Sequence, residues 1–561
     1  MTTSKWLVRK SGTAKYTILA SSLLQCLAAL CGIGIAFAMR GVIDCSVAGD
    51  MDGILRAAIF FAGLICVQIL LRAGSRMLSD ESNAIMVKNL RQEAFSEILK
   101  KDYTEASTYH SGELLTRMTS DVSVVAEGTS ALFPRLISSV VKMTGVLAAL
   151  YMTEPVLALI FAAGGSVFIV ASNIPRGLLG RLHHRVQESD GAARCFLQEC
   201  LESLLVIHAF GNENKMEQKN GAYLDVYRGA MRRRSLAGAF FGTVISSIMQ
   251  GGYFIGFIWC CIGIAEGNVS YGTMMAVVQL IGQIQTPFSE MGSVIPKFSA
   301  IMASAERLME ISVDEKRASD DGDLSNIAVS CAGKIYSEIR DIVFDRVSFS
   351  YGDGREVLCD ANFTVGKGEF VAFVGESGIG KSTLMKLMLS VYKPQSGGIY
   401  VNTFDGGMLS VNAFPSGMFA YVPQENHLMS GSIRDAVAFA ERSDAVSEER
   451  LVNACRTACA HEFITELPDG YNTLLGERGS GLSEGQMQRI AVARAIYSGC
   501  PIMLLDEATS ALDSDTERRM IRAMRELPNR TIFLITHRTD TLALCDRVVR
   551  FSADGTAYCS E

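Results

Sequence analysis

Six long apolar runs in the first 300 residues constrain the fold of this chain more than any other feature. A membrane-spanning helix needs about 20 consecutive apolar residues. Runs of that kind cover residues 16–39, 54–73, 132–152, 155–174, 240–265 and 273–295. Hydrophobic residues make up 49% of the 561 residues and charged residues 20%, which suits a membrane protein with a large soluble part. The sequence therefore predicts an α-helical six-helix domain over 1–311, embedded in a lipid bilayer.

The charges between these runs predict how the domain is oriented. Three short connections, 44–52, 153–154 and 266–270, carry acids but no Lys or Arg. The opposite side is rich in Lys and Arg, as at 232–234. Because positively charged loops stay in the cytoplasm, both termini are predicted to be cytoplasmic. We expect an integral membrane protein, most simply of a bacterial cytoplasmic membrane.

Two inner segments, 76–130 and 177–236, are much longer than a connecting loop requires. They are poor in Pro and Gly, and their apolar residues recur at helical spacing. The spanning helices are therefore expected to continue into the cytoplasm and turn back there as long extensions. Residues 312–340 contain charged stretches with little apolar content, which predicts a linker. The part that follows, 341–561, alternates short strands with helices and is predicted to be an α/β P-loop ATPase domain.

A glycine-rich loop carries the first sign of chemistry in this second part. It follows the apolar strand 370–374 and precedes a helix, which is the context in which GxxxxGKS binds nucleotide phosphates. Backbone N–H groups and the helix dipole would hold the phosphates of ATP. The Lys side chain would reach the β- and γ-phosphates, and the Ser hydroxyl would bind Mg²⁺. The predicted nucleotide-binding residues are Gly375, Glu376, Ser377, Gly378, Ile379, Gly380, Lys381, Ser382 and Thr383.

A second apolar strand, 502–505, ends in two acids, Asp506 and Glu507. Asp506 is placed to hold Mg²⁺ through water, and Glu507 to polarise the water that attacks the γ-phosphate. Positioning and charge stabilisation of this kind suffice for phosphoryl transfer. The alternative is that the pair only caps the following helix. His537 follows a third apolar strand, 531–536, where a lone His is usually structural.

The stretch Leu482-Ser483-Glu484-Gly485-Gln486, about a hundred residues after the phosphate loop, resembles the signature of the ABC transporter family. Together with the membrane half, it makes the whole chain resemble an exporter-type half-transporter, in which a membrane domain is fused to a nucleotide-binding domain. Two cytoplasmic stretches, 110–121 and 304–307, look like that family's first inner loop and its exit from the sixth helix. The turning points 103–113 and 210–217 would be its coupling helices.

The resemblance implies roles for further residues. His537 would contact the γ-phosphate and Glu507, and Gln424 would sense Mg²⁺ and water. Tyr351 would stack on adenine, although it could be an ordinary strand-end tyrosine. The signature residues Ser483, Gly485 and Gln486 would complete the ATP site of the opposite subunit, and Asp513 would lie in the loop that crosses between the two sites. Glu484 departs from the glycine that the commonest form of the signature has there.

The same resemblance implies an ATPase coupled to transport, built from two half-transporters. Two ATP molecules would clamp the ATPase domains together and switch the membrane cavity by alternating access. The expected activity is export of small molecules, peptides or lipids. The alternatives are an importer of siderophore-type metal chelates and one subunit of a heterodimer with an impaired ATP site, which Glu484 leaves open. No basic stripe predicts nucleic-acid binding.

Polar residues inside the predicted spans point to a substrate path. Lys142 lies in the middle of 132–152, where a cation costs about 2.5–3.5 kcal/mol and normally faces a cavity or a partner. We predict that it lines the path and favours an anionic cargo. Gln279 and Gln283 share a helix face and are predicted to line the same path. Pairing of Lys142 with an acid such as Glu290 is an equally open alternative.

Overall fold

The computed structural model describes residues 3–101, 103–107, 109, 111–171, 176–311, 329–351, 356–414, 417–425, 428–441, 446–476, 481–552 and 555–560. Most of the predicted linker, 312–328, and the end of the predicted span 155–174 lie outside these residues. The chain forms two compact units. One consists of Met1–Lys100 and Tyr109–Ser312, and the other of Val313–Glu561 together with Lys101–Thr108, which contains the short helix α4 (Tyr103–Ser107).

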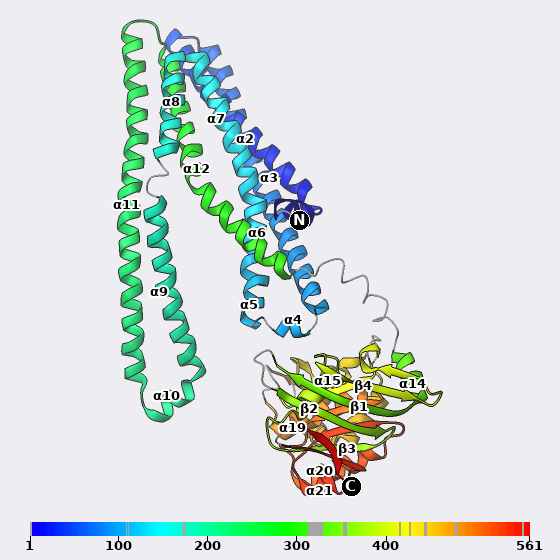
Figure 1. The fold of residues 1–561 in the computed structure, drawn as a ribbon. Coiled ribbons are helices and arrows are strands. Elements are labelled where there is room, and N and C mark those ends of the chain that lie inside the picture. The colour runs from blue at the N-terminus through cyan, green and yellow to red at the C-terminus, as the bar shows by residue number, and fades with distance from the viewer. Residues whose placement is uncertain are drawn as a thin grey trace. The chain divides into compact units, whose positions relative to one another are not determined.

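The first unit is entirely helical in its described residues (Figure 1). Its helices are α1 (Thr3–Lys10), α2 (Ala14–Ala48), α3 (Met51–Lys100), α5 (Ser111–Thr116), α6 (Val122–Glu127), α7 (Phe133–Thr153), α8 (Pro155–Ala171), α9 (Arg176–Glu202), α10 (Leu204–Phe210), α11 (Glu213–Ala265) and α12 (Tyr271–Ile311). Two π-helical turns, η1 (Arg117–Asp121) and η2 (Gly128–Leu132), join α5, α6 and α7 into one long helix.

Helices of this unit are long and apolar enough to cross a membrane. Within the described residues there are four such helices, Ala14–Ala48, Met51–Lys100, Gly112–Thr153 and Glu213–Ala265, and α8 is a shorter apolar helix. The 53 residues of α11 extend about 80 Å at the usual rise, far beyond the ~30 Å hydrocarbon core of a bilayer. As predicted, helices such as α3 and α11 therefore run on well past the membrane, and α9 and α11 lie side by side.

A polar cluster ties α12 to the turn η1, although the two are far apart in the sequence. Arg307 donates from Nη2 to Oδ1 of Asp121 at 2.5 Å and from Nε to Oδ2 at 2.8 Å. Ser304 Oγ donates to the same carboxylate at 2.9 Å, and Arg117 Nη1 donates to the carbonyl of Arg307 at 2.9 Å. The two stretches that resemble the family's first inner loop and sixth-helix exit thus hold each other in place.

The second unit is built on two main sheets. One has six strands in the order β12-β11-β3-β10-β9-β6, parallel except for the β11–β12 pair, and the other has four antiparallel strands in the order β2-β1-β4-β5. The strands are β1 (Ile339–Ser350), β2 (Glu356–Gly366), β3 (Phe370–Val374), β4 (Ser396–Thr403), β5 (Met408–Ser410), β6 (Phe419–Val422), β9 (Ile502–Asp506), β10 (Thr531–Ile535), β11 (Arg547–Phe551) and β12 (Ala557–Ser560), and a small pair is formed by β7 (Gly431–Ser432) and β8 (Leu474–Leu475).

Helices cover these sheets (Figure 1). They are α14 (Val329–Glu338), α15 (Lys381–Met388), α16 (Ile433–Val437), α17 (Glu448–Thr457), α18 (His461–Glu466), α19 (Glu484–Tyr497), α20 (Ser514–Arg525) and α21 (Thr539–Leu542), with single 3₁₀ turns at Val411–Ala413, Ala438–Ala440 and Gly470–Asn472. The predicted fold class, a helical membrane domain followed by an α/β P-loop domain, is confirmed.

The parallel sheet brings the predicted chemistry to one edge. Its central strands are buried on both faces, as their unbroken apolar sequences predict. In the register of the sheet, Ile535 of β10 pairs with Phe373 of β3 on one side and with Asp506 of β9 on the other. The three strands therefore end at the same level, and the segments that follow them meet at this edge.

Candidate functional site

The glycine-rich loop leaves β3 at Gly375 and enters α15 at Lys381. Gly378 and Gly380 have φ values of 80° and 111°, a region that favours glycine. A Cβ atom at Gly380 would also lie 2.8 Å from the carbonyl oxygen of Val357. Both the backbone conformation and the available space thus require glycine at this position. Of the other loop residues, Glu376 and Ser377 are exposed, and Ile379 packs against the core beneath the loop.

Lys381 folds back over the loop that precedes it. Its Nζ donates to the carbonyls of Gly375 and Glu376, each at 2.7 Å. Burial lowers the pKa of Lys381, while the carboxylates of Glu507 and Asp506 act in the opposite direction. The two hydrogen bonds therefore fix the ammonium group of Lys381 against the loop, in the lining of the cavity described below.

The acid pair stands at the end of β9, next to the loop. The buried Asp506 accepts hydrogen bonds from Ser382 Oγ at 2.9 Å and from Tyr421 Oη at 3.2 Å. Burial raises the pKa of Asp506, and these two hydrogen bonds partly oppose that effect. Tyr421, which sequence reasoning did not single out, lies three residues before Gln424 at the end of β6.

Glu507 adopts a left-handed backbone conformation with φ of 51°, which is uncommon for a residue with a side chain and clusters at functional sites. Its Oε2 accepts a hydrogen bond from Gln424 Nε2 at 2.9 Å. His537 Nε2 lies 3.8 Å from Glu507 Oε1, too far for a hydrogen bond. The structure thus brings Gln424, Glu507 and His537 together from three separate segments.

These groups surround a cavity of about 400 Å³. Its lining contains Tyr351, Val357, Ser377, Gly378, Gly380, Lys381, Ser382, Thr383, Gln424 and Glu507. Tyr351 Oη lies 3.0 Å from Thr383 Oγ1, and its ring meets Phe349 and Tyr392 edge to face. An aromatic ring, a phosphate-type loop and a carboxylate therefore share one cavity.

The signature residues have a different position. Ser483 caps α19, accepting from the backbone N–H of Gln486 at 3.3 Å, while its own N–H donates to Gln486 Oε1 at 2.8 Å. A Cβ atom at Gly485 would lie 2.9 Å from the carbonyl of Ala511, so the signature packs closely against the loop that leads to Asp513. Asp513 caps α20 through the N–H of Thr516 at 2.9 Å. The described residues that line the 400 Å³ cavity include none of the predicted residues Ser483, Gly485, Gln486 and Asp513.

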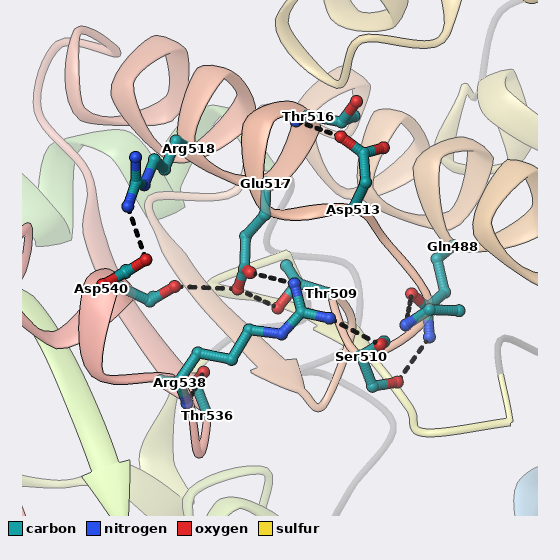
Figure 2. A network of polar contacts seen from close by, with 12 residues as sticks. Gln488, Thr509, Ser510, Asp513, Thr516, Glu517, Arg518, Thr536, Arg538 and Asp540 are labelled. Carbon is teal, nitrogen blue, oxygen red and sulfur yellow. Dashed lines mark hydrogen bonds and ion pairs between the residues drawn. The ribbon is translucent and has the colours of Figure 1, made fainter.

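A buried polar network joins these segments, and sequence reasoning missed its members (Figure 2). Glu517 of α20 is buried and accepts hydrogen bonds from Thr509 Oγ1 at 2.8 Å, Thr541 Oγ1 at 2.9 Å and Arg538 Nη1 at 2.6 Å. Arg538 also donates from Nη2 to the carbonyl of Ser510 at 3.1 Å. The only indication in the sequence that these residues matter was their closeness to predicted site residues. Arg538 directly follows His537, and Glu517 lies four residues after Asp513.

The network continues to the signature helix. Gln488 of α19 donates to Ser510 Oγ at 2.9 Å and accepts from the N–H of Ala511 at 3.0 Å. The segment from Ser510 to Asp513 is therefore held on one side by α19 and on the other by Arg538 (Figure 2).

The first unit holds a separate cavity of about 670 Å³. Lys142, Gln279 and Gln283, the three residues predicted for the substrate path, all line it. Gln283 Nε2 donates to the carbonyl of Gly32 at 2.8 Å. The side chain of Glu290, the alternative partner of Lys142, lies outside the described residues.

Comparisons with known proteins agree with this architecture. The family described as the ABC transporter transmembrane region matches residues 17–288, and the family described as ABC transporter matches residues 358–510. Together these matches cover well over half of the chain. The chain therefore contains both the membrane region and the ATP-binding domain of the family.

Individual relatives match over most of the chain. The ATP-dependent lipid A-core flippase of Haemophilus influenzae (strain 86-028NP) is 27% identical over 552 residues, covering 95% of this chain and 90% of the flippase. The serine protease/ABC transporter B family protein tagA of Dictyostelium discoideum is 27% identical over 530 residues, and the match covers 94% of this chain but only 29% of that relative.

A solved structure of a bacterial Atm1-family ABC exporter with ATP bound has the same fold. It aligns with a TM-score of 0.77 and 22% identity over 99% of this chain and 95% of the exporter chain. The protein is thus an integral membrane protein with an ATPase coupled to transport, and it belongs to the ABC transporter family as an exporter-type half-transporter.

Proposed function

We propose that this protein hydrolyses ATP, dimerises, and moves its cargo across the cytoplasmic membrane by alternating access, as an exporter. The observation that carries the proposal is the meeting of Lys381, Ser382, Gln424 and Glu507 around one cavity, with Asp506 hydrogen-bonded to Ser382. Phosphoryl transfer depends on positioning and on charge stabilisation, and this set of groups can provide both.

The cavity suits a nucleotide. The backbone N–H groups of 375–380 and the side chain of Lys381 would hold the β- and γ-phosphates of ATP, and Tyr351 would contact the adenine. The hydroxyl of Ser382, the carboxylate of Asp506 and the amide oxygen of Gln424 are oxygen ligands of the kind that Mg²⁺ prefers. Mg²⁺ bound there would neutralise the charge that develops on the phosphate oxygens. Burial of Asp506 fits this assignment, because its ionised form needs a positive partner.

Glu507 is the proposed catalytic base that orients and polarises the attacking water. Its hydrogen bond from Gln424 fixes the direction of the carboxylate, and its strained backbone keeps the side chain at the mouth of the cavity. His537, whose Nε2 lies 3.8 Å from Glu507 Oε1, is the proposed neighbour of Glu507 and would contact the γ-phosphate when ATP is bound.

The signature residues support a dimer. Ser483, Gly485, Gln486 and Asp513 stand outside the lining of the cavity in their own chain. We infer that they complete the ATP site of a second half-transporter, where the N-terminus of α19 would present its positive dipole end to the phosphates. We favour a homodimer, since Glu507 is retained. Glu484, exposed in the first turn of α19, leaves a heterodimer as the alternative.

For the membrane domain, 1–311, we propose six crossings and cytoplasmic termini in a bacterial cytoplasmic membrane. The linker 312–340 would connect it to the ATPase domain, 341–561, with α14 and the start of β1 at the end of that linker already packed on the core of the ATPase domain. ATP would act as a ligand that favours one of two states of the dimer, and hydrolysis would reset it. Export is proposed because the fold is that of an exporter; import of a siderophore-type chelate is the opposite direction, to be tested in vesicles.

The decisive experiment replaces Glu507 with Gln in the full-length protein in lipid nanodiscs. If Glu507 is the base, ATP turnover falls by about a hundredfold or more, while ATP binding persists and a closed dimer accumulates. Glu526→Gln, an exposed substitution at the end of α20, is the matched control and should keep wild-type turnover. Wild-type turnover in Glu507→Gln would overturn the assignment.

The direction of transport is tested in vesicles. ATP-driven uptake of cargo into inside-out vesicles would establish export. If inside-out vesicles take up no cargo and cargo instead accumulates on the cytoplasmic side of the membrane, the protein is an importer.

A further inference from the structure

The 670 Å³ cavity of the membrane domain is lined by four cations and one acid. Arg72 and Arg76 come from α3, Arg135 and Lys142 from α7, and Asp80 is the one acid among the described lining residues. Sequence reasoning identified only Lys142. The lining helices α2, α3, α7 and α12 pack against one another within a single unit, so the cavity does not depend on how the two units are placed.

The spacing of the cations puts each pair on one side of its helix. Arg72 and Arg76 are four residues apart, and residues at that spacing are neighbours on a helix surface. Arg135 and Lys142 are seven residues, or two turns, apart, which separates them by about 10 Å along α7. The positive charge therefore extends along the cavity from the inner end of the predicted spans towards their middle.

The arginines of this cavity have no acidic partner among the described residues, whereas other arginines of the unit do. Among the described residues, Arg72, Arg76 and Arg135 make no salt bridge. By contrast, Arg40, Arg117 and Arg307 each lie within 3.4 Å of a carboxylate. A charge at membrane depth, such as Lys142, is costly and normally faces a functional cavity or a partner, and the three arginines lie at or near the inner ends of their predicted spans. Four cations against one acid, Asp80, in the described lining favour a ligand that brings negative charge.

Two neutral side chains of the cavity place a second requirement on its ligand. The Oε1 atoms of Gln279 and Gln283 are buried and have no hydrogen-bond partner among the described residues. Both side chains line the same cavity as the arginines. Each oxygen can accept a hydrogen bond, and a buried acceptor left unpaired is costly. Hydroxyl or amide N–H groups on a ligand would satisfy both oxygens.

We propose that the cargo of this transporter is a polyanion that also carries hydroxyl or amide donors, with phosphate or carboxylate groups bound by Arg72, Arg76, Arg135 and Lys142. Guanidinium groups match the geometry of phosphate and carboxylate, so the arginines supply the selectivity. This inference rests on the proposed transport function, which it deepens by naming the chemical class of the cargo. The same chemistry could come from a phosphorylated lipid headgroup or from a soluble organic phosphate.

Anion binding is measured in the absence of ATP. A negative result then contradicts this proposal alone, because the measurement does not depend on ATP turnover. The full-length protein is placed in phosphatidylcholine nanodiscs and titrated with inositol trisphosphate, which carries both phosphates and free hydroxyl groups, and myo-inositol serves as the uncharged analogue. In a second arm, phosphatidylinositol phosphate, whose headgroup carries phosphate and free hydroxyl groups, is titrated into the nanodiscs in place of phosphatidylcholine. Binding in either arm, weakened by salt and absent with the neutral analogue, is the expected result. The arm that responds identifies a soluble or a lipid source.

The variant Arg72→Gln/Arg135→Gln should raise the half-saturating anion concentration about tenfold or more. Arg72→Lys/Arg135→Lys, which keeps the charge, should recover part of the affinity. Arg56→Gln, on the same helix α3 but outside the lining, is the matched control and should bind as wild type. If neither anion binds, if myo-inositol binds equally well, or if the double Gln variant binds with wild-type affinity while folded, the proposal is wrong.

Discussion

At the scale of single residues, burial decides the ionisation of several side chains in the ATPase domain. It raises the pKa of Asp506 and lowers that of Lys381, because burial disfavours the charged form of each group. Lys381 and Ser382 line the cavity that suits a nucleotide, and Asp506 accepts a hydrogen bond from Ser382. Lys381 would gain a partner of opposite charge from the phosphates of ATP, and Asp506 would gain one from Mg²⁺.

The same effect makes a prediction for Cys455. Burial raises the pKa of this thiol to about 11, although a hydrogen bond with Tyr471 acts in the opposite direction. The thiol form is therefore favoured in the folded state, and folding stability falls as the pH rises from the ordinary thiol pKa of 9.0 to about 11. Maleimide at pH 7 should label the exposed Cys195 of α9 but leave Cys455 unlabelled until the domain is unfolded in urea.

Peptide mass mapping after labelling measures both sites in one sample. Cys455→Ala identifies the peptide and should leave the labelling of Cys195 unchanged. Rapid modification of Cys455 in the folded protein at pH 7 would show that this thiol is not buried as described.

At the scale of elements, Glu517 holds three segments together. Its carboxylate accepts from Thr509 just before Ser510, from Arg538 just after His537 and from Thr541 of α21 (Figure 2). Because Arg538 also donates to the carbonyl of Ser510, a movement of the segment from Ser510 to Asp513 would be expected to reach the residue next to His537. We expect this network to set the position of both segments.

Glu517→Ala should therefore destabilise the ATPase domain by about 1–3 kcal/mol, since it leaves buried donors without an acceptor. Arg518→Ala is the matched control on the same helix. It removes the exposed pair Arg518–Asp540, which lies on the surface at 2.5 Å, and should cost about 0–1 kcal/mol. Hydrogen exchange of the amides of α20 and β10 reports the local stability of each variant. Equal effects of the two substitutions would contradict the importance given to the buried network.

At the scale of the whole molecule, the proposed dimer makes each ATP site from two chains. Lys381→Met inactivates the phosphate loop of a chain, and Ser483→Arg blocks the signature of a chain. Each variant alone should lack ATP turnover, because every site in its homodimer contains one defect. When the two are co-expressed with different tags, the mixed dimer has one site with both wild-type elements and should regain part of the turnover.

Double-affinity purification isolates the mixed dimers for this measurement. A pair of Lys381→Met chains with distinct tags, purified in the same way, is the control that should stay inactive. If the mixed dimer has no turnover although it forms, the two sites are not shared between chains in the way proposed.

The sequence by itself determined the elements whose signals are local. Apolar runs of membrane length, and the order of strand, glycine-rich loop and helix, depend on residues close together in the chain, so they predicted the fold class and the nucleotide-type loop. The carboxyl ends of parallel strands must meet at one edge, which is why Asp506, Glu507 and His537 could be expected near Lys381. Their catalytic roles remain predictions.

Only the tertiary structure decided which distant side chains meet. The rotation and packing of α3 and α7 gather Arg72, Arg76 and Arg135 beside Lys142, and the path of α12 brings Arg307 to Asp121. Glu517 and Arg538 likewise meet only because α20 and the segment after β10 fold onto each other. Such contacts depend on how helices pack against one another. The spacing of residues within one segment does not predict which side chains of another segment it will contact.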